Sequence, residues 1–163
     1  MTIIIRRART ADIREIHGLV REYPGIVLDK AAVALYEDVQ EFWVAERDGA
    51  IAGCGALHVM WEDLAEVRTV VVDPRYRKQG IGHEILTKLL DAARSVGVSR
   101  VFVLTFEVDF FAEHGFREIE GTPVPHDVYA ELLRSYDEGV AEFLNLERVK
   151  PNTLGNTRML CVL

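Results

Sequence analysis

Six consecutive residues, Arg77 to Gly82, combine the side chains and the backbone freedom that anion binding needs. The glycines at positions 80 and 82 allow backbone N–H groups to point outward, and Arg77 and Lys78 add positive charge beside them. A helix is expected directly after this loop, and its dipole adds further partial positive charge there. A phosphate or pyrophosphate fits such a site. On loop composition alone, an ordinary solvated strand-to-helix turn is the alternative.

The residues on either side of the loop predict the elements that position it. Before the turn at Asp73-Pro74, the valine-rich run that ends VVVDP predicts a strand that begins near Glu66. After the loop, apolar residues recur at steps of three to five positions and predict one helical stripe: Ile81, Ile85, Leu86, Leu89, Leu90 and Ala93. The motif is neither a P-loop nor a dinucleotide fingerprint, because the required lysine and third glycine are missing.

Composition limits the classes of function. The chain has 163 residues, of which 49% are hydrophobic and 28% charged, as in an ordinary globular domain. Its formal net charge of −7 argues against a general nucleic-acid or anionic-membrane binder, because either partner would repel the average surface. An anionic ligand must therefore be held by a local basic cluster.

The two cysteines and the apolar segments indicate the compartment. Cys54 and Cys161 are too few for a disulfide framework or a zinc site, and both lie in apolar runs typical of buried thiols. No segment approaches the ~20 apolar residues of a membrane span, and the first residues lack a signal-peptide pattern. We expect a cytoplasmic protein that binds neither nucleic acid nor membrane, and no metal.

Periodicity and turn residues predict the order of the remaining elements. Strands are expected over 2–7, 41–47, 50–60, 100–106, 116–119 and 158–163. Helices are expected after a cap at Thr10, and over 30–38, 107–114, 126–135 and 137–146. Asp48-Gly49 predicts a tight hairpin, and the glycine-rich strand IAGCGALHVM indicates a bulge or a close approach of backbone or ligand.

This order predicts a single domain over residues 1–163 in the α/β (α+β) class. The expected architecture is a mixed, mostly antiparallel central sheet with helices on both faces. The run VFVLTF is too apolar for a solvated edge strand and predicts a strand buried on both faces.

The succession of VVVDP, RxxGxG, an amphipathic helix, VFVLTF and FFAEHGF resembles the GCN5-related N-acetyltransferase (GNAT) family. The resemblance implies that acetyl-CoA is the co-substrate and that its pantetheine pairs with the backbone of Val70, Val71 and Val72. It also implies that the pyrophosphate is held by Arg77, Lys78, Gln79, Gly80, Ile81 and Gly82. In the following helix many members carry a tyrosine as general acid where this chain has Phe111, which is expected beside the cofactor.

A narrower resemblance is to the short bacterial N-acetylglutamate synthases that lack an amino-acid kinase domain. It is carried by EFWVAERDG, GCGALHV, FFAEHGFREIEGTPV and the tail VKPNTLGNTRMLCVL. The resemblance implies acetylation of the α-amine of glutamate or glutamine, a small-molecule acceptor, at the first step of arginine biosynthesis. The alternatives are acetylation of another amine, such as a polyamine or a protein terminus, and a non-catalytic acetyl-CoA sensor.

Acetyl transfer requires a neutral amine, and Glu66 is the best candidate for the base that removes its proton. It is expected to share a strand face with Arg68, Val70 and Val72, and the matching glutamate of the synthases is proposed to act through a water. A structural ion pair with Arg68 is the alternative. Thr105, on the next strand, is a weaker candidate for the acid. His58 and His114 are more typical of surface or packing residues.

An acidic amino acid requires cations for its carboxylates. The candidates are Arg68 with Thr69 beside Glu66, Lys30 after GIVLDK, and Arg158 in NTRML. The longer synthases carry arginine where this chain has Asp29-Lys30. The sequence leaves open whether residues 120–156 cover the substrate site, supply the face of a homodimer or do both.

Overall fold

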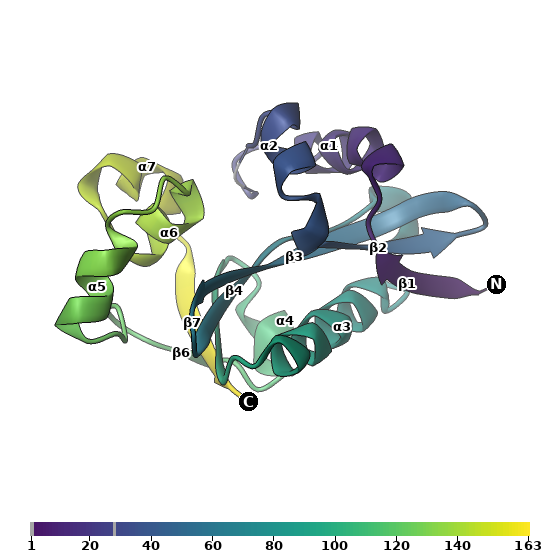
Figure 1. The fold of residues 1–163 in the computed structure, drawn as a ribbon. Helices are drawn as coiled ribbons and strands as arrows, with labels where there is room; N and C mark the ends of the chain where they lie inside the picture. Colours follow the sequence, from purple (N-terminus) through teal and green to yellow (C-terminus); the bar gives the residue numbers. More distant parts are fainter. Residues whose placement is uncertain (1, 28) are drawn as a thin grey trace. The chain divides into compact units, whose positions relative to one another are not determined.

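The computed structural model describes residues 2–27 and 29–163. Within these residues seven strands form a sheet in the order β1-β2-β3-β4-β5-β7-β6 (Figure 1). β4 and β5 are parallel, whereas β1–β2, β2–β3, β5–β7 and β6–β7 are antiparallel. The predicted mixed, mostly antiparallel sheet is confirmed. The strands are β1 (Ile3–Arg7), β2 (Phe42–Arg47), β3 (Ala50–Trp61), β4 (Leu64–Val72), β5 (Arg100–Thr105), β6 (Arg117–Glu118) and β7 (Thr157–Val162).

The helices follow the predicted order, with shorter pieces in the second half of the chain. They are α1 (Ile13–Arg21), α2 (Ala32–Glu37), α3 (Ile81–Val96), α4 (Val108–Ala112), α5 (His126–Leu132), α6 (Glu138–Phe143) and α7 (Lys150–Thr153). The predicted cap at Thr10 is wrong, because Thr10–Asp12 forms a 3-10 turn and Asp12 is the N-cap of α1. α7 was not predicted, since Pro151 and Asn152 interrupt any apolar pattern.

The chain divides into two compact units, and β3 and β4 run through both. Unit 1 comprises Met1–His58 and Val67–Val96, and unit 2 comprises Val59–Glu66 and Gly97–Leu163. The single domain over residues 1–163 stays a prediction. Each unit has its own apolar cluster.

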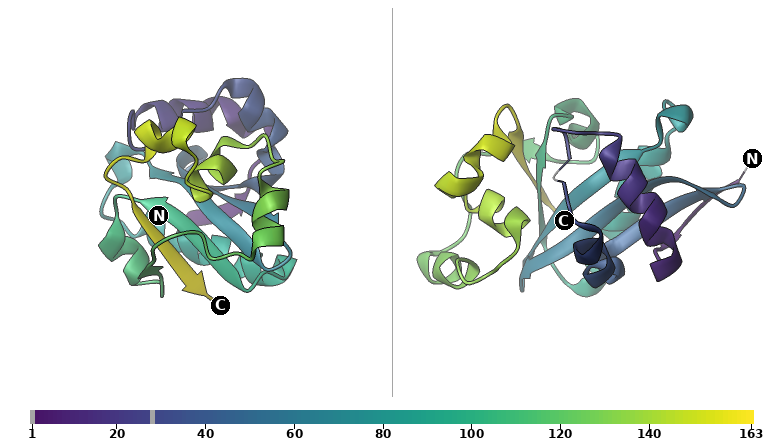
Figure 2. Two further views of the ribbon diagram at one scale, coloured as in Figure 1. Left: turned by 90° about the vertical axis from the view of Figure 1, so that its left-hand side faces the viewer. Right: turned by 90° about the horizontal axis from the view of Figure 1, so that it is seen from above.

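Unit 1 is a strand layer with helices on both faces, α1 and α2 on one and α3 on the other (Figure 1). The view from above shows α1 lying across the strands (Figure 2). The apolar cluster under α1 and α2 includes Ile13, Ile16, Leu35, Phe42, Val44, Cys54 and Val71. Asp48 and Gly49 adopt φ of 52° and 81°, as the predicted tight hairpin between β2 and β3 requires.

The two glycines of β3 explain why α3 packs so closely on the sheet. A β-carbon at position 55 would lie 2.8 Å from Ile85 Cγ2 and 2.9 Å from Leu89 Cδ1. A β-carbon at Gly53 would lie 2.9 Å from the carbonyl oxygen of Val71. The close approach that the glycines predicted is therefore that of α3 and β4.

Unit 2 buries one face of its strands under the segment that follows β6. Its apolar cluster joins Met60, Leu64 and Phe102 of the strands to Val128, Leu132, Val140 and Phe143 of α5 and α6. Phe102 and Phe143 meet edge to face, with ring centres 4.9 Å apart. α5, α6 and α7 are grouped together in this unit (Figure 2). Within unit 2, part of the 120–156 segment thus covers the sheet.

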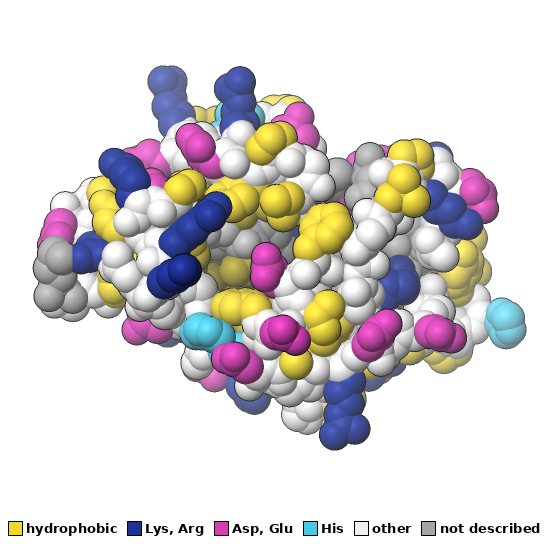
Figure 3. Space-filling view, turned by 180° about the vertical axis from the view of Figure 1, so that it is seen from behind, with side chains coloured by type: hydrophobic (Ala, Val, Ile, Leu, Met, Phe, Trp, Pro, Cys, Tyr) yellow, Lys and Arg dark blue, Asp and Glu magenta, His cyan; other side chains and the backbone are white. Residues whose placement is uncertain are grey.

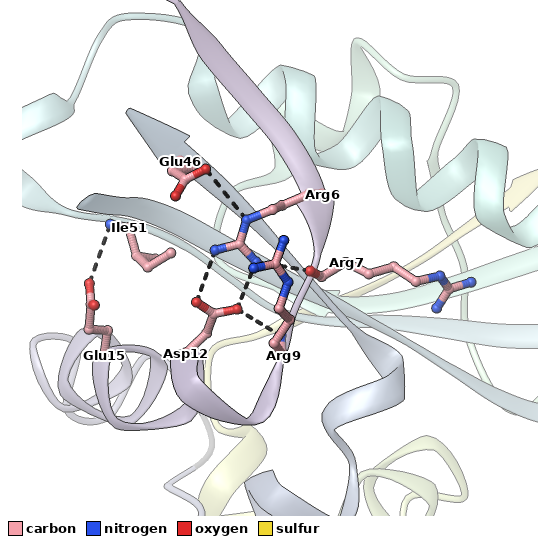
Figure 4. Close-up of polar contacts among 7 residues, drawn as sticks. All are labelled: Arg6, Arg7, Arg9, Asp12, Glu15, Glu46 and Ile51. Atoms are coloured by element: carbon pink, nitrogen blue, oxygen red, sulfur yellow. Dashed lines mark hydrogen bonds and ion pairs between the residues drawn. The ribbon is translucent and has the colours of Figure 1, made fainter. Parts of the chain in front are cut away.

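An ion-pair network fixes the start of α1 in unit 1 (Figure 4). Arg6 of β1 donates to both oxygens of Asp12, at 2.8 and 3.0 Å, and its Nε lies 3.5 Å from Glu46 of β2. The backbone N–H of Arg9 donates to the same carboxylate at 2.7 Å. The hydrogen bonds from Arg6, the largest cause, hold the pKa of Asp12 below its usual value. The ionised carboxylate of Asp12 therefore ties the start of α1 to β1, and Arg6 extends the network to Glu46 of β2.

Replacing Asp12 by Asn is expected to lower the free energy of unfolding by about 1–3 kcal/mol at neutral pH, because the bidentate bond to Arg6 is lost. The pKa of Asp12 is lower in the folded state, so its contribution is complete above the unfolded pKa of about 3.9 and disappears as pH falls through the folded value. Urea unfolding between about pH 5 and pH 2.5 measures this loss.

The exposed pair Arg94–Asp91 supplies the matched control. Asp91→Asn should change the unfolding free energy by less than about 0.5 kcal/mol, because surface pairs contribute little. A difference between wild type and Asp12→Asn that does not shrink on acidification would contradict the ionised role of Asp12.

Candidate active site

The predicted anion loop forms an exposed turn that leads directly into α3. Lys78 and Gly80 both have left-handed backbones, with φ of 62° and 80°, and α3 begins at Ile81. The first helical bond that closes onto the loop runs from the N–H of Glu84 to the carbonyl of Gly80, at 3.2 Å. The N–H groups of the first turn have no partner inside a helix, so those of Ile81 and Gly82 face the loop. The geometry is that of an anion site at the start of a 16-residue helix.

Tyr23 ties this loop to the end of β4. Its hydroxyl donates to the carbonyl oxygen of Val72 at 2.5 Å and accepts from Arg77 at 3.2 Å. The guanidinium of Arg77 also lies over the Tyr23 ring, 5.5 Å from its centre. Arg77 is thus oriented beside the loop while remaining exposed.

Two further contacts hold the rest of the loop. Arg47 of β2 donates to the side chain of Gln79 and lies over the ring of Tyr76. Arg75 is bound to Asp73, with its backbone N–H at 2.9 Å and its Nη2 at 2.8 Å from the carboxylate. These bonds from Arg75, its side-chain bond first, hold the pKa of Asp73 below the usual range. Arg75 and Arg77 therefore have different partners although both are exposed.

β4 contains a backbone irregularity just before the predicted pantetheine strand. Thr69 has φ of 58°, which is rare for a β-branched residue, and its carbonyl accepts the Cys54 thiol at 3.6 Å. Such a residue is typical of a β-bulge, which interrupts the alternation of side chains. The prediction that Glu66, Arg68, Val70 and Val72 all point to one face of the strand is therefore wrong, because the alternation is interrupted at Thr69. Val71 lies in the cluster under α1.

Glu66 is a buried carboxylate on unit 2's part of β4. It is 4% exposed and stands opposite Phe102 in the parallel β4–β5 pairing, which covers Leu64–Glu66. Leu104, two residues after Phe102, is paired with Arg158 of β7. Cross-strand partners, and residues two apart, point to the same face, so Glu66 and Arg158 share one face of the unit 2 sheet.

Arg158 makes an extensive set of contacts within unit 2. Its guanidinium donates to the carbonyl oxygens of Gly121, Glu142 and Phe143, at 2.5 to 3.2 Å. It lies over the Phe102 ring at 4.9 Å. Burial lowers its pKa, and the negative charge of Glu66 opposes that effect. The structure thus brings together two of the predicted site residues, Glu66 and Arg158.

Two other predicted site residues of unit 2, Thr105 and Phe111, are not placed beside Glu66. Thr105 lies on the opposite face of the sheet, and Phe111 packs into the interior. Thr105 is an odd number of residues from Phe102 on β5 and so faces the opposite side of the sheet, where its oxygen accepts the N–H of Glu107 at 2.8 Å. Phe111 of α4 is 5% exposed and meets Phe116 edge to face. The Phe111 environment is that of a packing residue.

Three further residues that the sequence singles out lie in unit 1: Lys30, Arg68 and His58. Lys30 lies 3.5 Å from Asp38, and its side chain is mostly buried. Arg68 is half-buried on β4. His58 Nδ1 lies 2.9 Å from a carboxylate oxygen of Glu41, a pair that the sequence did not predict because the residues are 17 positions apart. Tyr23 was missed for the same reason, since it is 49 positions from Val72.

Charge on the surface is mixed. On the face drawn in Figure 3, Lys and Arg side chains are interspersed with Asp and Glu. Among residues 2–27 and 29–163 no group of three or more His, Cys, Asp or Glu side chains could hold a metal ion. None of the helices described is both long and apolar enough to cross a membrane.

Comparison with known proteins agrees with this geometry. Residues 11–116 match the acetyltransferase (GNAT) family. The chain is 60% identical to an amino-acid acetyltransferase of Mycobacterium tuberculosis over 98% of its length and 94% of that protein. It is 35% identical to the amino-acid acetyltransferase of Neisseria meningitidis serogroup B over 76% of its length, but only 29% of that longer protein.

Two solved structures show the same fold. A Mycobacterium tuberculosis protein in complex with CoA and NLQ has a TM-score of 0.97 at 60% identity and covers 98% of this chain and 99% of its own. The N-acetylglutamate synthase of Neisseria gonorrhoeae, complexed with coenzyme A and N-acetyl-glutamate, has a TM-score of 0.78 at 26% identity and covers 100% of this chain and 35% of its own. On its sequence match and its fold, the chain belongs to the acetyltransferase (GNAT) family.

Proposed function

We propose that the protein transfers the acetyl group of acetyl-CoA to the α-amine of L-glutamate or L-glutamine. The observation that carries the proposal is a buried carboxylate, Glu66, on the strand that leads into the amide-rich and basic start of α3. Two similar proteins support the choice of acceptor. One is the amino-acid acetyltransferase of Mycobacterium tuberculosis. The other is the N-acetylglutamate synthase of Neisseria gonorrhoeae, whose structure contains coenzyme A and N-acetyl-glutamate.

The start of α3 binds the cofactor phosphates in this proposal. The N–H groups of Ile81 and Gly82 donate to the pyrophosphate, and Arg77 and Lys78 supply its counter-charge. Gln79 orients the turn through its bond with Arg47. The residues fit the group, because the first turn of α3 and the left-handed Lys78 and Gly80 expose backbone amides next to two cations. The backbone of Val70, Val71 and Val72 pairs with the pantetheine.

Acetyl-CoA supplies the activated acetyl thioester, and the chain's own residues handle the proton. The ammonium form of the substrate has no lone pair, so Glu66 accepts the proton of the amine, directly or through one water. The neutral amine then attacks the carbonyl carbon, and the C–S bond breaks to release the thiolate of CoA. The nitrogen loses its remaining extra proton to that thiolate or to water, which leaves the neutral amide. Thiols have a pKa of about 8.5, so an acid at this step contributes little, and Thr105 stays a weak candidate for it.

Direct transfer is favoured over a cysteine intermediate. Burial raises the pKa of the Cys54 thiol to about 12, so almost none of it is the nucleophilic thiolate at neutral pH. Cys161 is also buried, and its thiol contacts the carbonyl of His114.

The substrate carboxylates need cations, and we assign them to Arg68 and the adjacent Thr69. Arg68 is half-buried on β4, two residues from the base. Lys30 remains a candidate that must exchange its ion pair with Asp38 for the substrate. Arg158 is the least suited, because four hydrogen bonds to carbonyl oxygens occupy most of its five donors.

We further propose that the product is used in arginine biosynthesis. We also propose that the reaction takes place in the cytoplasm. Both described cysteines are free, which suits a reducing compartment. A homodimer stays a prediction.

A panel of acceptors tests the proposal. Thiol release from acetyl-CoA should be fastest with glutamate or glutamine and slower by tenfold or more with polyamines or a peptide terminus. The reverse order would refute the amino-acid acceptor. Cofactor binding without thiol release from any acceptor would instead identify a sensor.

A further inference from the structure

We infer that Arg158 is a positioning residue for Glu66: it supplies a fixed positive charge that holds the base ionised, in place of the substrate contact that the sequence predicts. The inference rests on the proposed function only in naming Glu66 as the base. Its structural part, a charge coupling between the two side chains, stands on unit 2 alone.

The sheet register places the two residues on one face. Glu66 is paired with Phe102 across β4 and β5, and the guanidinium of Arg158 covers the Phe102 ring at 4.9 Å. This is the face that carries the Phe102–Phe143 cluster under α5 and α6. Glu66 is 4% exposed, so water only weakly screens its interaction with a cation on the same face.

Arg158 is held in place by backbone rather than by another carboxylate. The carbonyls of Glu142 and Phe143 belong to the last turn of α6, and that of Gly121 precedes α5. Carbonyls at a helix C-terminus carry partial negative charge and favour a cation. The rings of Phe102 and Phe143 add cation–π contacts at 4.9 and 5.9 Å. These contacts fix the position of the guanidinium without neutralising its charge through a hydrogen-bonded carboxylate.

Other charged side chains lie on the same elements of unit 2. Burial lowers the pKa of Arg158, and the charge of Glu66 raises it again, which is the sign expected of a coupled pair. Arg100 of β5 is engaged with Asp63 at 3.2 Å, and Glu138 of α6 with Arg148 at 2.7 Å. The other ionisable groups on these elements of unit 2 include the buried Glu142 of α6, the exposed His126, Asp127 and Glu131 and the half-buried Tyr129 of α5, and the exposed Arg117 and Glu118 of β6. Arg68 follows Glu66 two residues later on β4.

The pH dependence of kcat/KM for the amino acid tests the inference in the active enzyme. Removing the cation disfavours the charged form of Glu66, so Arg158→Gln should move the acidic limb upward by about one unit or more. Arg158→Lys retains the charge and should leave the limb within about half a unit of wild type. An unmoved limb together with a KM for glutamate raised more than tenfold would overturn the inference and identify a substrate ligand.

A double-mutant cycle in unfolding tests the coupling without any activity. Arg158→Gln should raise the equilibrium constant for unfolding. When Glu66 is present, this increase should be about tenfold larger at pH 8 than at pH 5. In the Glu66→Gln background this extra loss should vanish. Equal losses in both backgrounds would overturn the coupling whether or not Glu66 is the base. The two proposals can fail separately. If the unfolding cycle shows coupling but Glu66→Gln keeps full activity, the charge pair is supported and Glu66 is refuted as the base.

Discussion

Glu66→Gln is expected to lower kcat by about 10²- to 10⁴-fold, because an amide of the same shape cannot accept the proton of the attacking amine. The KM for acetyl-CoA should change less than about threefold, since the phosphate site at the start of α3 is untouched. Steady-state kinetics with glutamate and glutamine measure both values. The acidic limb of the pH profile should also disappear, because the group that titrates is gone.

The matched control is Glu41→Gln, which neutralises a partly buried carboxylate that binds His58. It should change kcat less than about threefold, because Glu41 lies outside the proposed catalytic set. A Glu66→Gln enzyme with wild-type kcat would refute the base, and an equal loss in both variants would indicate a general effect of removing carboxylates.

Arg77→Ala has the second largest expected effect, a rise of about 10- to 100-fold in the KM for acetyl-CoA. A charge-assisted hydrogen bond to a phosphate contributes about 1.5–3 kcal/mol, and kcat depends on it little. The rise should be larger at low ionic strength, because salt screens the exposed guanidinium. Initial rates over a series of acetyl-CoA concentrations at two ionic strengths measure both effects.

Arg75→Ala is the control for Arg77, since it removes an exposed arginine of the same loop whose guanidinium is bound to Asp73. Its KM for acetyl-CoA should stay within about twofold of wild type. Tyr23→Phe keeps the ring under Arg77 but removes the hydroxyl that joins Arg77 to Val72, so it isolates the effect of orientation. If Arg75→Ala and Arg77→Ala raise the KM equally, net loop charge rather than Arg77 holds the phosphates.

The elements that sequence predicts well are those defined by neighbours along the chain. The Asp48-Gly49 hairpin follows from two residues that tolerate positive φ, and α3 follows from an apolar stripe that all lies on one side of a helix. The left-handed backbone at Thr69 has no such signal, because a β-branched residue argues against it. α7 also lacks one, since it is four residues long and contains a proline.

The candidate site divides in the same way. The loop from Arg77 to Gly82 is local, so residue type and spacing indicate an anion site before any fold is known. The partners of Arg158 are up to 37 positions away in sequence, and the pairing of Tyr23 with Val72 spans 49. Such contacts depend on which strands become neighbours. Spacing alone therefore predicts that Arg158 is available to a substrate, whereas in the structure it donates hydrogen bonds to carbonyl oxygens.

Identifying the product of the reaction tests the central claim most directly. Glutamate labelled with a nitrogen isotope at its α-amine is incubated with acetyl-CoA and the enzyme, and the product is analysed by NMR and mass spectrometry. We expect one acetyl group per product molecule, with the labelled nitrogen converted from an amine to an amide in step with thiol release. Thiol release that leaves the labelled amine unmodified, for glutamine as well as for glutamate, would contradict it.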